Sequence, residues 1–293
     1  MNTTAPKPYI GRFAPSPSGP LHFGSLIAAL GSFLQARHHQ GRWLLRIEDL
    51  DPPREVPGAA DEILFSLDAF GLHWDGPVLY QSQRLDVYQH LLEQWEKRGL
   101  TYYCHCSRKE IAESGGFYNG HCRYLNLGAK GSGTRLIMSN PVYEFVDLLQ
   151  GKVKIDRALA EEDFIVRRRD GFYAYNLAVV IDDAHTGISE VVRGADLLAP
   201  TGRQISLYQQ LNAPVPSWLH LPLATVAGNK LSKQNHAPAL DINHASNQLC
   251  QALRFLGQAP PATLATAPVA EVLAWAIAHW QLQQVPKTTQ IAL

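Results

Sequence analysis

The sequence has few cysteines, no surplus of charge of either sign and no long apolar run. Its 4 cysteines in 293 residues argue against a framework of disulfides. The 26 basic and 26 acidic residues cancel, so the overall charge gives no evidence of a nucleic-acid partner, and any RNA site must be a local patch. No apolar stretch reaches the roughly 20 residues that span a bilayer. The first residues, MNTTAPKPYIGRF, lack the apolar core of a secretory signal, and we therefore expect a cytoplasmic enzyme without a membrane partner.

The composition is that of an ordinary globular protein. Hydrophobic residues make up 46% and charged residues 18%, and the length allows a full core and two domains. The sequence contains no internal repeat. The run Arg167-Arg168-Arg169 is a candidate basic patch, but on a strand its side chains would alternate between faces, which favours a solvated edge.

The N-terminal third alternates strand and helix patterns. Strands at 9–14 and 42–47, with a helix at 21–40 between them, form one βαβ unit whose crossover is expected to be right-handed. Two further helices are expected at 57–71 and 84–99, where they could flank the sheet. In an open parallel sheet the carboxyl ends of the strands face the ligand crevice, so the second strand should place an acidic pair, Glu48-Asp49, beside a ligand.

Residues Gly11 to Leu26, GRFAPSPSGPLHFGSL, lead from the first strand into the helix through a Pro/Gly/Ser-rich turn. A helix N-terminus leaves N–H groups unpaired and carries about half a positive charge, so it attracts phosphate. His22 can donate a hydrogen bond to a phosphate oxygen, and Gly24 lets a flat base or sugar approach the backbone. The spacing alone does not decide between this site and a turn in which Gly19 and Gly24 serve only packing and His22 is an exposed helix residue.

A second motif follows the expected apolar strand at 221–226. Ala227 to Asn235 reads AGNKLSKQN, with Lys230 and Lys233 three positions apart. Two flexible ammonium groups can hold a triphosphate and follow its charge as pyrophosphate departs. Such a turn alone is more often a solvated loop, but together with the first motif it predicts an ATP site.

The rest of the chain divides into segments of different composition and pattern. The segment 101–190 is rich in Cys, His, Gly and short strand patterns and is predicted to be an insertion. Within it we expect a hairpin turn at Asp170-Gly171 and an apolar helix from Tyr175. The elements expected after it are a strand at 188–193 and helices at 195–211, 243–257 and 267–283.

Three cysteines lie close together in the insertion. They are Cys104, Cys106 and Cys122. A C-x-C pair with a more distant cysteine fits a structural zinc site, for which tetrahedral coordination requires a fourth ligand. The nearby candidates are His105, His121 and Tyr118, and chemistry alone would favour a histidine. Cys250 lies far off in an apolar helix and is assigned to packing.

Five segments occur between about Gly11 and Asn235 in the order of a known family: RFAPSPSGPLHFGSL, RIEDLDPPR, YNLAVVIDD, VVRGADLL and KLSKQN. They resemble the class I aminoacyl-tRNA synthetases of the glutamate-specific kind, which are ATP-dependent ligases. The resemblance implies an α/β fold: a Rossmann-like parallel sheet with an inserted α+β zinc-bearing subdomain and a short C-terminal helical region. Two departures are Ser25, where glycine or histidine is more usual, and Gln234-Asn235 at the end of the lysine loop.

The larger departure is length. Glutamyl-tRNA synthetases continue into a large helical region that reads the anticodon, whereas 60 residues follow Lys233 in this chain of 293. The sequence is therefore more similar to the short glutamyl-queuosine tRNA(Asp) synthetase family. That family activates glutamate without tRNA and esterifies it onto the queuosine base in the anticodon of tRNA(Asp).

The resemblance divides the chain into four parts. The catalytic core is expected at 1–100 and 191–240, with the lysine loop in its second half. An acceptor-binding-like subdomain with the zinc site is expected at 101–190, and a helical region without an anticodon-binding domain at 241–293. The implied partners are ATP, L-glutamate and queuosine-containing tRNA(Asp), and the chain is expected to act as a monomer.

The residues for ATP and metal follow from the two motifs and the cysteines. His22 and Lys233 are assigned to the phosphates as the catalytic residues, with Mg²⁺ as counter-ion. The other expected ATP-binding residues are Gly24, Ser25, Lys230, Leu231 and Ser232. At the metal the resembled family uses a tyrosine in the place of Tyr118. One structural Zn²⁺ per chain is thus expected on Cys104, Cys106, Tyr118 and Cys122.

Glutamate carries one ammonium and two carboxylates, so its site needs an acid and one or two guanidinium groups. Glu48 suits the ammonium, and Arg12 and Arg193 suit the carboxylates through bidentate bonds. The resemblance completes the pocket with Phe13, Ala14, Pro15, Ser16 and Tyr175.

Simpler interpretations of these residues remain open. Without the resemblance, Glu48 would be a surface ion pair with Arg46 or Arg54, and Tyr175 a core aromatic. The alternative functions are a truncated glutamyl-tRNA synthetase that charges the tRNA 3′ end and a non-enzymatic amino-acid or RNA-binding paralogue. Another nucleotidyltransferase with the same ATP core would not explain Glu48, Tyr175 and Arg193 together.

Overall fold

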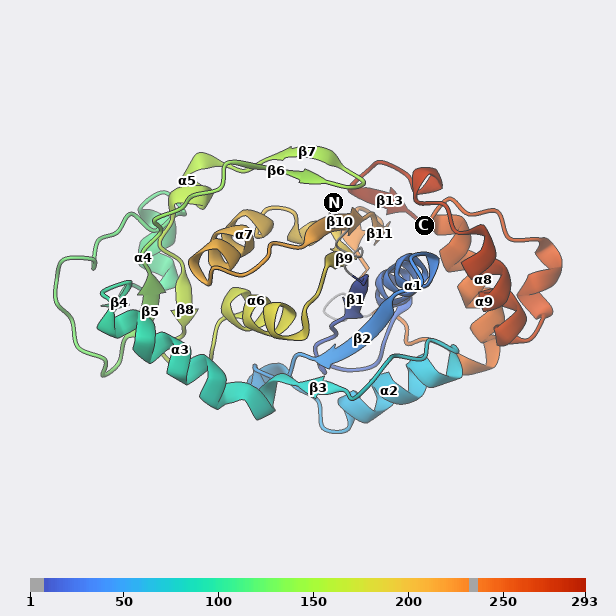
Figure 1. Cartoon of the computed structure of the whole chain (residues 1–293), viewed down its shortest axis with the longest axis horizontal. Helices are drawn as coiled ribbons and strands as arrows, with labels where there is room; N and C mark the ends of the chain where they lie inside the picture. The colour runs from blue at the N-terminus through green and yellow to red at the C-terminus, as the bar shows by residue number, and fades with distance from the viewer. Residues whose placement is uncertain (1–7, 232–236) are drawn as a thin grey trace, which may run out of the picture.

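The computed structural model describes residues 8–231 and 237–293, so the predicted ATP-binding residues Ser232 and Lys233 lie outside the described residues. Parallel strands form the centre of the molecule (Figure 1). They are β1 (Ile10–Phe13), β2 (Arg42–Ile47), β3 (Leu79–Tyr80), β9 (Glu190–Gly194) and β10 (Ser217–Leu221). The order is β3-β2-β1 in one hydrogen-bonded group and β9-β10 in the other.

The two groups of strands meet between β1 and β9. The Ser189 N–H donates to the Ile10 carbonyl oxygen at 2.9 Å, and the Ile10 N–H donates to Ser189 Oγ at 2.8 Å. The strand order runs in opposite directions from the contact between β1 and β9, because β1 is followed by β2 on one side and β9 is followed by β10 on the other. Such a switch point leaves a crevice at the carboxyl ends of the strands, where ligands bind in open α/β sheets.

Helices cover both faces of the sheet because successive strand residues point to opposite sides. On β9, for example, Val192 joins the core under α1 and Val191 joins the core under α6. The first face carries α1 (Phe23–His38), α2 (Ala59–Ala69), α8 (Ala245–Phe255) and α9 (Val269–His279) (Figure 1). The second carries α3 (Leu85–Lys97), α6 (Tyr175–Thr186) and α7 (Thr201–Gln210). Among the described residues, no helix is both long and apolar enough to cross a bilayer.

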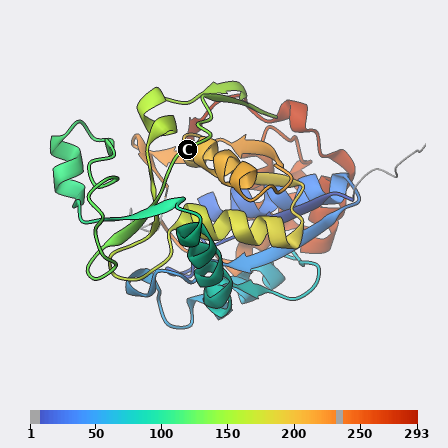
Figure 2. The same cartoon turned by 60° about the vertical axis from the view of Figure 1, so that its left-hand side comes forward.

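The segment between α3 and α6 forms a lobe beside the core. Its antiparallel sheet is β4 (Thr101–Cys104), β5 (Gly133–Leu136) and β8 (Ile165–Arg167), and its short helices are α4 (Arg108–Glu113) and α5 (Arg157–Glu161). The part around α4, green at the left of Figure 2, stands away from the sheet. A hairpin of β6 (Glu144–Asp147) and β7 (Gly151–Lys154) returns to the core, where the Leu148 N–H donates to the Trp218 carbonyl oxygen.

The C-terminal segment folds back onto the core. Helices α8 and α9 pack against α1, and β13 (Gln290–Ala292) pairs in parallel with β11 (Leu223–Val226). On its other edge β11 pairs with β12 (Asn229–Lys230). The strand that leads into the lysine loop is therefore held by the end of the chain.

Two expected elements are wrong in extent, and a proline explains each. The helix predicted at 195–211 is a short 3₁₀ turn followed by α7, which begins at Thr201. Pro200 has no N–H to continue the turn before it, and its fixed φ favours the start of a new helix. The strand predicted at 221–226 is split at Pro222 into β10 and β11, because proline cannot donate to a ladder.

Two adjacent aspartates on α6 tie the helix to the sheet. The Asp183 carboxylate accepts hydrogen bonds from Arg12 Nε of β1 and Arg46 Nη1 of β2. Burial alone would raise its pKa, but the two guanidinium groups hold the pKa of Asp183 below its usual value. Asp182 accepts from Gln81, Arg84 and the Tyr88 hydroxyl. Together, the contacts of the two carboxylates fix α6 and α3 against the ends of the strands.

Replacing Tyr88 by phenylalanine tests this anchor. The ring is fully buried and its hydroxyl donates to Asp182 Oδ2 at 2.6 Å, so the variant keeps the packing and loses one bond to a charged acceptor. We expect the free energy of unfolding to fall by about 1–2 kcal/mol, measured by urea denaturation. Tyr103→Phe is the matched control, because its hydroxyl donates to Glu96 at the exposed surface. Equal losses in both variants would contradict the anchor.

Candidate active site

A cleft of about 1190 Å³ opens at the carboxyl ends of the strands. One wall comes from the core: Ser16 lies beyond the end of β1, and Glu48 and Gln81 directly follow β2 and β3. Tyr175, the first residue of α6, lies on the same wall. The opposite wall comes from the lobe, including the turn at 168–170. The predicted position of Glu48 at the carboxyl end of its strand is thus confirmed.

Glu48 lies in a buried charged environment. Its carboxylate accepts a hydrogen bond from Arg46 Nη2 at 3.1 Å, and the two side chains are only 9% and 4% exposed. The ion pair with Arg46 is therefore present, but it is not a surface pair. Burial raises the pKa of Glu48, against the opposing charges of Arg46 and Arg12. A cationic ligand group beside this carboxylate would stabilise its charged form.

Tyr175 faces the cleft. Its side chain is 39% exposed, so it is not an enclosed core aromatic. Burial of the phenol raises the pKa of Tyr175, while the nearby positive charge of Arg193 works in the opposite direction. The charge of Glu48 also raises this pKa, whereas the charge of Arg12 lowers it. Of the four residues predicted for one pocket, Glu48 and Tyr175 line the cleft, whereas Arg12 and Arg193 are buried and do not line it.

Arg193, on β9, is the most constrained of the four. Its Nε donates to His220 Nε2 at 3.0 Å, and its Nη2 donates to Thr201 Oγ1 at 2.8 Å. Its Nη1 is buried and has no hydrogen-bond partner among the described residues. Burial lowers the pKa of Arg193, because the charged group has left water. A buried donor without a partner is costly, and a ligand carboxylate would satisfy it.

Arg12 is less available to bind a ligand carboxylate than was predicted. Its Nε lies 3.2 Å from both carboxylate oxygens of Asp183, and its Nη1 donates to the Val192 carbonyl oxygen at 3.4 Å. The adjoining segment is tied to Glu48, whose N–H donates to the Pro15 carbonyl oxygen. Phe13 is buried against Trp43, and Ala14 is half-buried next to it.

The two predicted phosphate motifs approach each other at Gly24. His22 is the N-cap of α1, where its Nδ1 accepts from the Ser25 N–H at 3.3 Å. A neutral ring in this orientation carries its proton on Nε2. A Cβ at Gly24 would lie 3.1 Å from the Leu231 carbonyl oxygen, so glycine permits this close approach of the lysine loop. Lys230 forms an ion pair with Asp196.

The arginine run of the lobe borders the cleft. The predicted turn at Asp170-Gly171 is confirmed by a bridge between Arg167 and Tyr173. Arg168 and Arg169 line the cleft, so the run does not lie wholly at a solvated edge. Arg168 also pairs with Asp51 across the cleft, at 3.3 Å between Nη1 and Oδ1.

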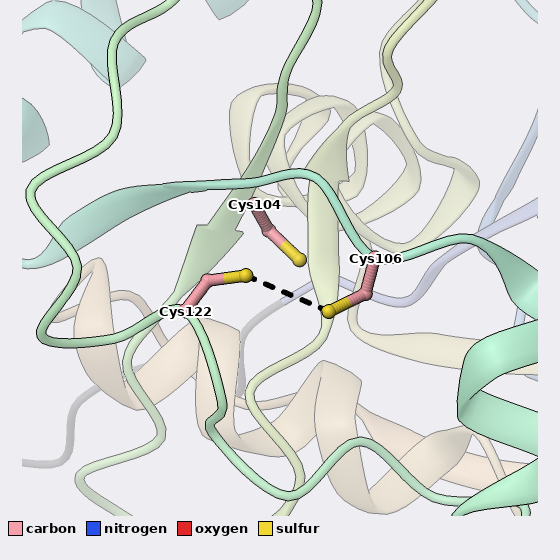
Figure 3. Close-up of side chains that lie close together, drawn as sticks. All are labelled: Cys104, Cys106 and Cys122. Atoms are coloured by element: carbon pink, nitrogen blue, oxygen red, sulfur yellow. Dashed lines mark hydrogen bonds between the residues drawn. The ribbon is translucent and has the colours of Figure 1, made fainter.

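The three clustered cysteines form a potential metal site in the lobe, where two of them, Cys104 and Cys106, line the cleft. The Sγ atoms of Cys104, Cys106 and Cys122 lie within 4.8 Å of one another and point toward a common centre (Figure 3). Among the described residues, no histidine, aspartate or glutamate ligand atom joins them. The Tyr118 hydroxyl accepts from the Cys122 N–H at 2.7 Å, which places one oxygen, a possible fourth ligand, beside the three sulfurs. Three thiols and a phenol fit a soft, tetrahedral ion such as zinc.

A family model described as tRNA synthetases class I (E and Q), catalytic domain, matches residues 10–118 and 134–257. The chain belongs to this family. Two curated relatives are each named Glutamyl-Q tRNA(Asp) synthetase. The one from Photobacterium profundum is 61% identical over 97% of this chain and 92% of its own length, and the one from Serratia proteamaculans is 59% identical over 97% and 94%.

Solved synthetases share the fold of this family member. The crystal structure of a glutamate tRNA ligase from Elizabethkingia meningosepticum matches with a TM-score of 0.78 at 25% identity. The match covers 96% of this chain but 66% of that ligase. The glutamate-tRNA synthetase of Elizabethkingia anophelis matches with a TM-score of 0.79 over 97% of this chain and 68% of its own. The predicted class I synthetase fold is confirmed.

Four residues that support the candidate pocket were not identified from the sequence. They are Asp147, Asp183, Thr201 and His220. The signal for His220 was a histidine inside the apolar strand SWLHL, which needs a polar partner when buried. The signal for Asp183 was an adjacent pair of acids in the otherwise apolar helix YNLAVVIDD.

Proposed function

We propose that the protein activates L-glutamate with ATP in the absence of tRNA and transfers the glutamyl group to the queuosine base of tRNA(Asp). The observation that carries this proposal is the near-full-length match to curated glutamyl-Q tRNA(Asp) synthetases at 61% and 59% identity. The geometry supports the amino-acid half: Glu48 and Tyr175 line one cleft, and the buried guanidinium of Arg193, whose charge acts on Tyr175, has an Nη1 without a partner among the described residues.

In the first step a carboxylate oxygen of glutamate attacks the α-phosphorus of ATP. A new P–O bond forms, the bond to the β-phosphate breaks, and pyrophosphate leaves. Positioning and charge stabilisation dominate such a step. The proposed roles are Glu48 for the ammonium, Arg12 and Arg193 for the carboxylates, and Ser16 and Tyr175 for further hydrogen bonds.

The phosphates are assigned to the meeting point of the two motifs. We assign His22, Gly24, Ser25, Lys230, Leu231, Ser232 and Lys233 to ATP, whose charge Mg²⁺ would offset. The close approach of Gly24 and Leu231 supports this assignment for the described part of the loop. In the second step a hydroxyl of the acceptor attacks the glutamyl carbonyl, and AMP is released.

The lobe is proposed to be an acceptor-binding subdomain at 101–190 with one structural Zn²⁺ on Cys104, Cys106, Tyr118 and Cys122. The core would then comprise 1–100 and 191–240, followed by a helical region at 241–293. Position supports the assignment, because the sulfur cluster and the amino-acid pocket border the same cleft. The protein is proposed to act as a cytoplasmic monomer.

Pyrophosphate exchange tests the activation step. The protein is expected to exchange labelled pyrophosphate into ATP when glutamate is present and tRNA is absent. Glutamine lacks the second charged carboxylate and would forfeit a charge-assisted bond worth about 1.5–3 kcal/mol, so it should be rejected. Exchange that requires tRNA would favour the alternative of a truncated glutamyl-tRNA synthetase, and no exchange would favour a non-enzymatic paralogue.

A further inference from the structure

Arg193 and His220 face each other because of the strand register. Strands β9 and β10 run parallel, and His220 is the direct partner of Arg193 in the ladder. Both side chains therefore leave the sheet on the same face. Arg193 is 6% exposed and His220 is fully buried, so neither can exchange its protein partner for bulk water.

The hydrogen bonds assign the tautomer of His220. Arginine nitrogens only donate, so the 3.0 Å contact from Arg193 Nε requires a lone pair on His220 Nε2. The proton of the neutral ring then lies on Nδ1, which is 2.6 Å from Asp147 Oδ2. Burial and the charge of Arg193 lower the pKa of His220, although Asp147 opposes them. A neutral ring that donates to Asp147 and accepts from Arg193 satisfies every one of these contacts.

Asp147 is itself held in place. Its Oδ1 accepts from the N–H groups of Leu149 at 3.0 Å and Gln150 at 2.8 Å, at the turn of the β6–β7 hairpin. Burial would raise its pKa, but the bonds from His220 and the backbone keep the pKa of Asp147 below its usual value. A charged carboxylate on a fixed turn thus orients the imidazole.

Two of the three nitrogens of Arg193 are occupied, one by His220 and one by the segment 197–201. His220 holds Nε, and Thr201 Oγ1 with the Leu197 carbonyl oxygen holds Nη2. The guanidinium is planar, so fixing two nitrogens also fixes the direction of the third. The third is Nη1, which is buried and unpartnered among the described residues. The arrangement leaves this donor for a ligand.

We propose that Asp147 and His220 are positioning residues that orient Arg193 so that its Nη1 binds a carboxylate of the substrate. The naming of that substrate as glutamate rests on the proposed function. Preorganisation of a long side chain removes an ordering cost from binding. The β6–β7 hairpin of the lobe thereby contributes to amino-acid recognition without touching the amino acid.

Two substitutions at His220 separate this role from packing. His220→Phe keeps a ring that can stack on Trp218, whose ring centroid lies 6.5 Å away, but removes both ring nitrogens. His220→Gln offers a carbonyl oxygen that can accept from Arg193 Nε. We expect His220→Phe to raise the KM for glutamate in pyrophosphate exchange about 10- to 100-fold, with the KM for ATP unchanged. We expect His220→Gln to restore most of the affinity for glutamate.

Several kinetic results would contradict the proposal that Asp147 and His220 position Arg193. In a variant with the wild-type melting temperature, an unchanged KM for glutamate would show that His220 does not position Arg193. Equal rises in the KM for ATP and glutamate would indicate a structural role. A His220→Gln variant as impaired as His220→Phe would exclude the acceptor function of Nε2.

A second readout does not depend on activity. The ¹⁵N shifts of the His220 ring, assigned by comparing wild type with His220→Gln, are expected to report a neutral ring protonated on Nδ1 at pH 7. A proton on Nε2 would overturn the proposed positioning of Arg193 by His220. If wild type shows the tautomer protonated on Nδ1 but no glutamate-dependent exchange, the proposed function fails while the orientation of Arg193 by His220 stands.

Discussion

Replacing Arg193 by methionine is expected to nearly abolish glutamate activation. Removing one member of a buried, hydrogen-bonded charge pair costs about 2–5 kcal/mol, which corresponds to a factor of roughly 30 to several thousand in kcat/KM. Methionine preserves much of the apolar stem but has no donor for a carboxylate. The measurement is kcat/KM for glutamate in pyrophosphate exchange, with ATP saturating.

Arg193→Met removes a cation whose burial is costly, but it also leaves buried acceptors on His220 and Leu197 without this donor. The kinetics are therefore compared in variant protein whose melting temperature shows that it is folded. Arg37→Met is the matched control, because Arg37 pairs with Asp75 beside the start of β2, away from the carboxyl ends of the strands. Wild-type kinetics are expected in that control. Wild-type glutamate kinetics in Arg193→Met would refute the assignment of Arg193 to the substrate.

Replacing Cys122 by serine is expected to remove the proposed zinc and loosen the lobe. Structural zinc contributes about 10–16 kcal/mol of apparent binding free energy in zinc-finger peptides, and at the proposed site three thiolates would supply most of the ligand strength. Elemental analysis of purified protein should find stoichiometric zinc in wild type and only background in the variant. Limited proteolysis should then cleave the lobe between β4 and β5 first.

Cys250→Ser is the control for the metal experiment. Cys250 is buried in α8, apart from the sulfur cluster, so its replacement should leave the zinc content unchanged. Tyr118→Phe should weaken zinc binding less than Cys122→Ser, because the three thiolates remain. Full zinc content in Cys122→Ser would refute the site as drawn.

The sequence predicted those features that depend on local pattern. Glu48 could be placed because an apolar strand ends one residue before it and parallel strands present their carboxyl ends to ligands. The cysteine cluster followed from spacing alone. Pro200 and Pro222 were also local signals, but the helical pattern around Pro200 and the apolar residues on both sides of Pro222 obscured the breaks that they impose.

The support of the pocket could not be predicted in this way. Arg12 meets Asp183 across 171 positions, and His220 meets Asp147 across 73. These pairs depend on strand order, register and the return of the β6–β7 hairpin to the core. The donor proposed to complete the metal site also did not follow from spacing, since histidines flank the cysteines in sequence and only the family resemblance indicated Tyr118, whose hydroxyl accepts from the Cys122 N–H.

Transfer of labelled glutamate to tRNA from cells grown with and without queuine tests the central claim most directly. The proposed function predicts that only queuosine-containing tRNA(Asp) becomes labelled and that the label lies in the anticodon loop after nuclease cleavage. Equal labelling of both tRNA pools, or label at the 3′ end, would contradict it and identify the protein as a glutamyl-tRNA synthetase that charges the acceptor end.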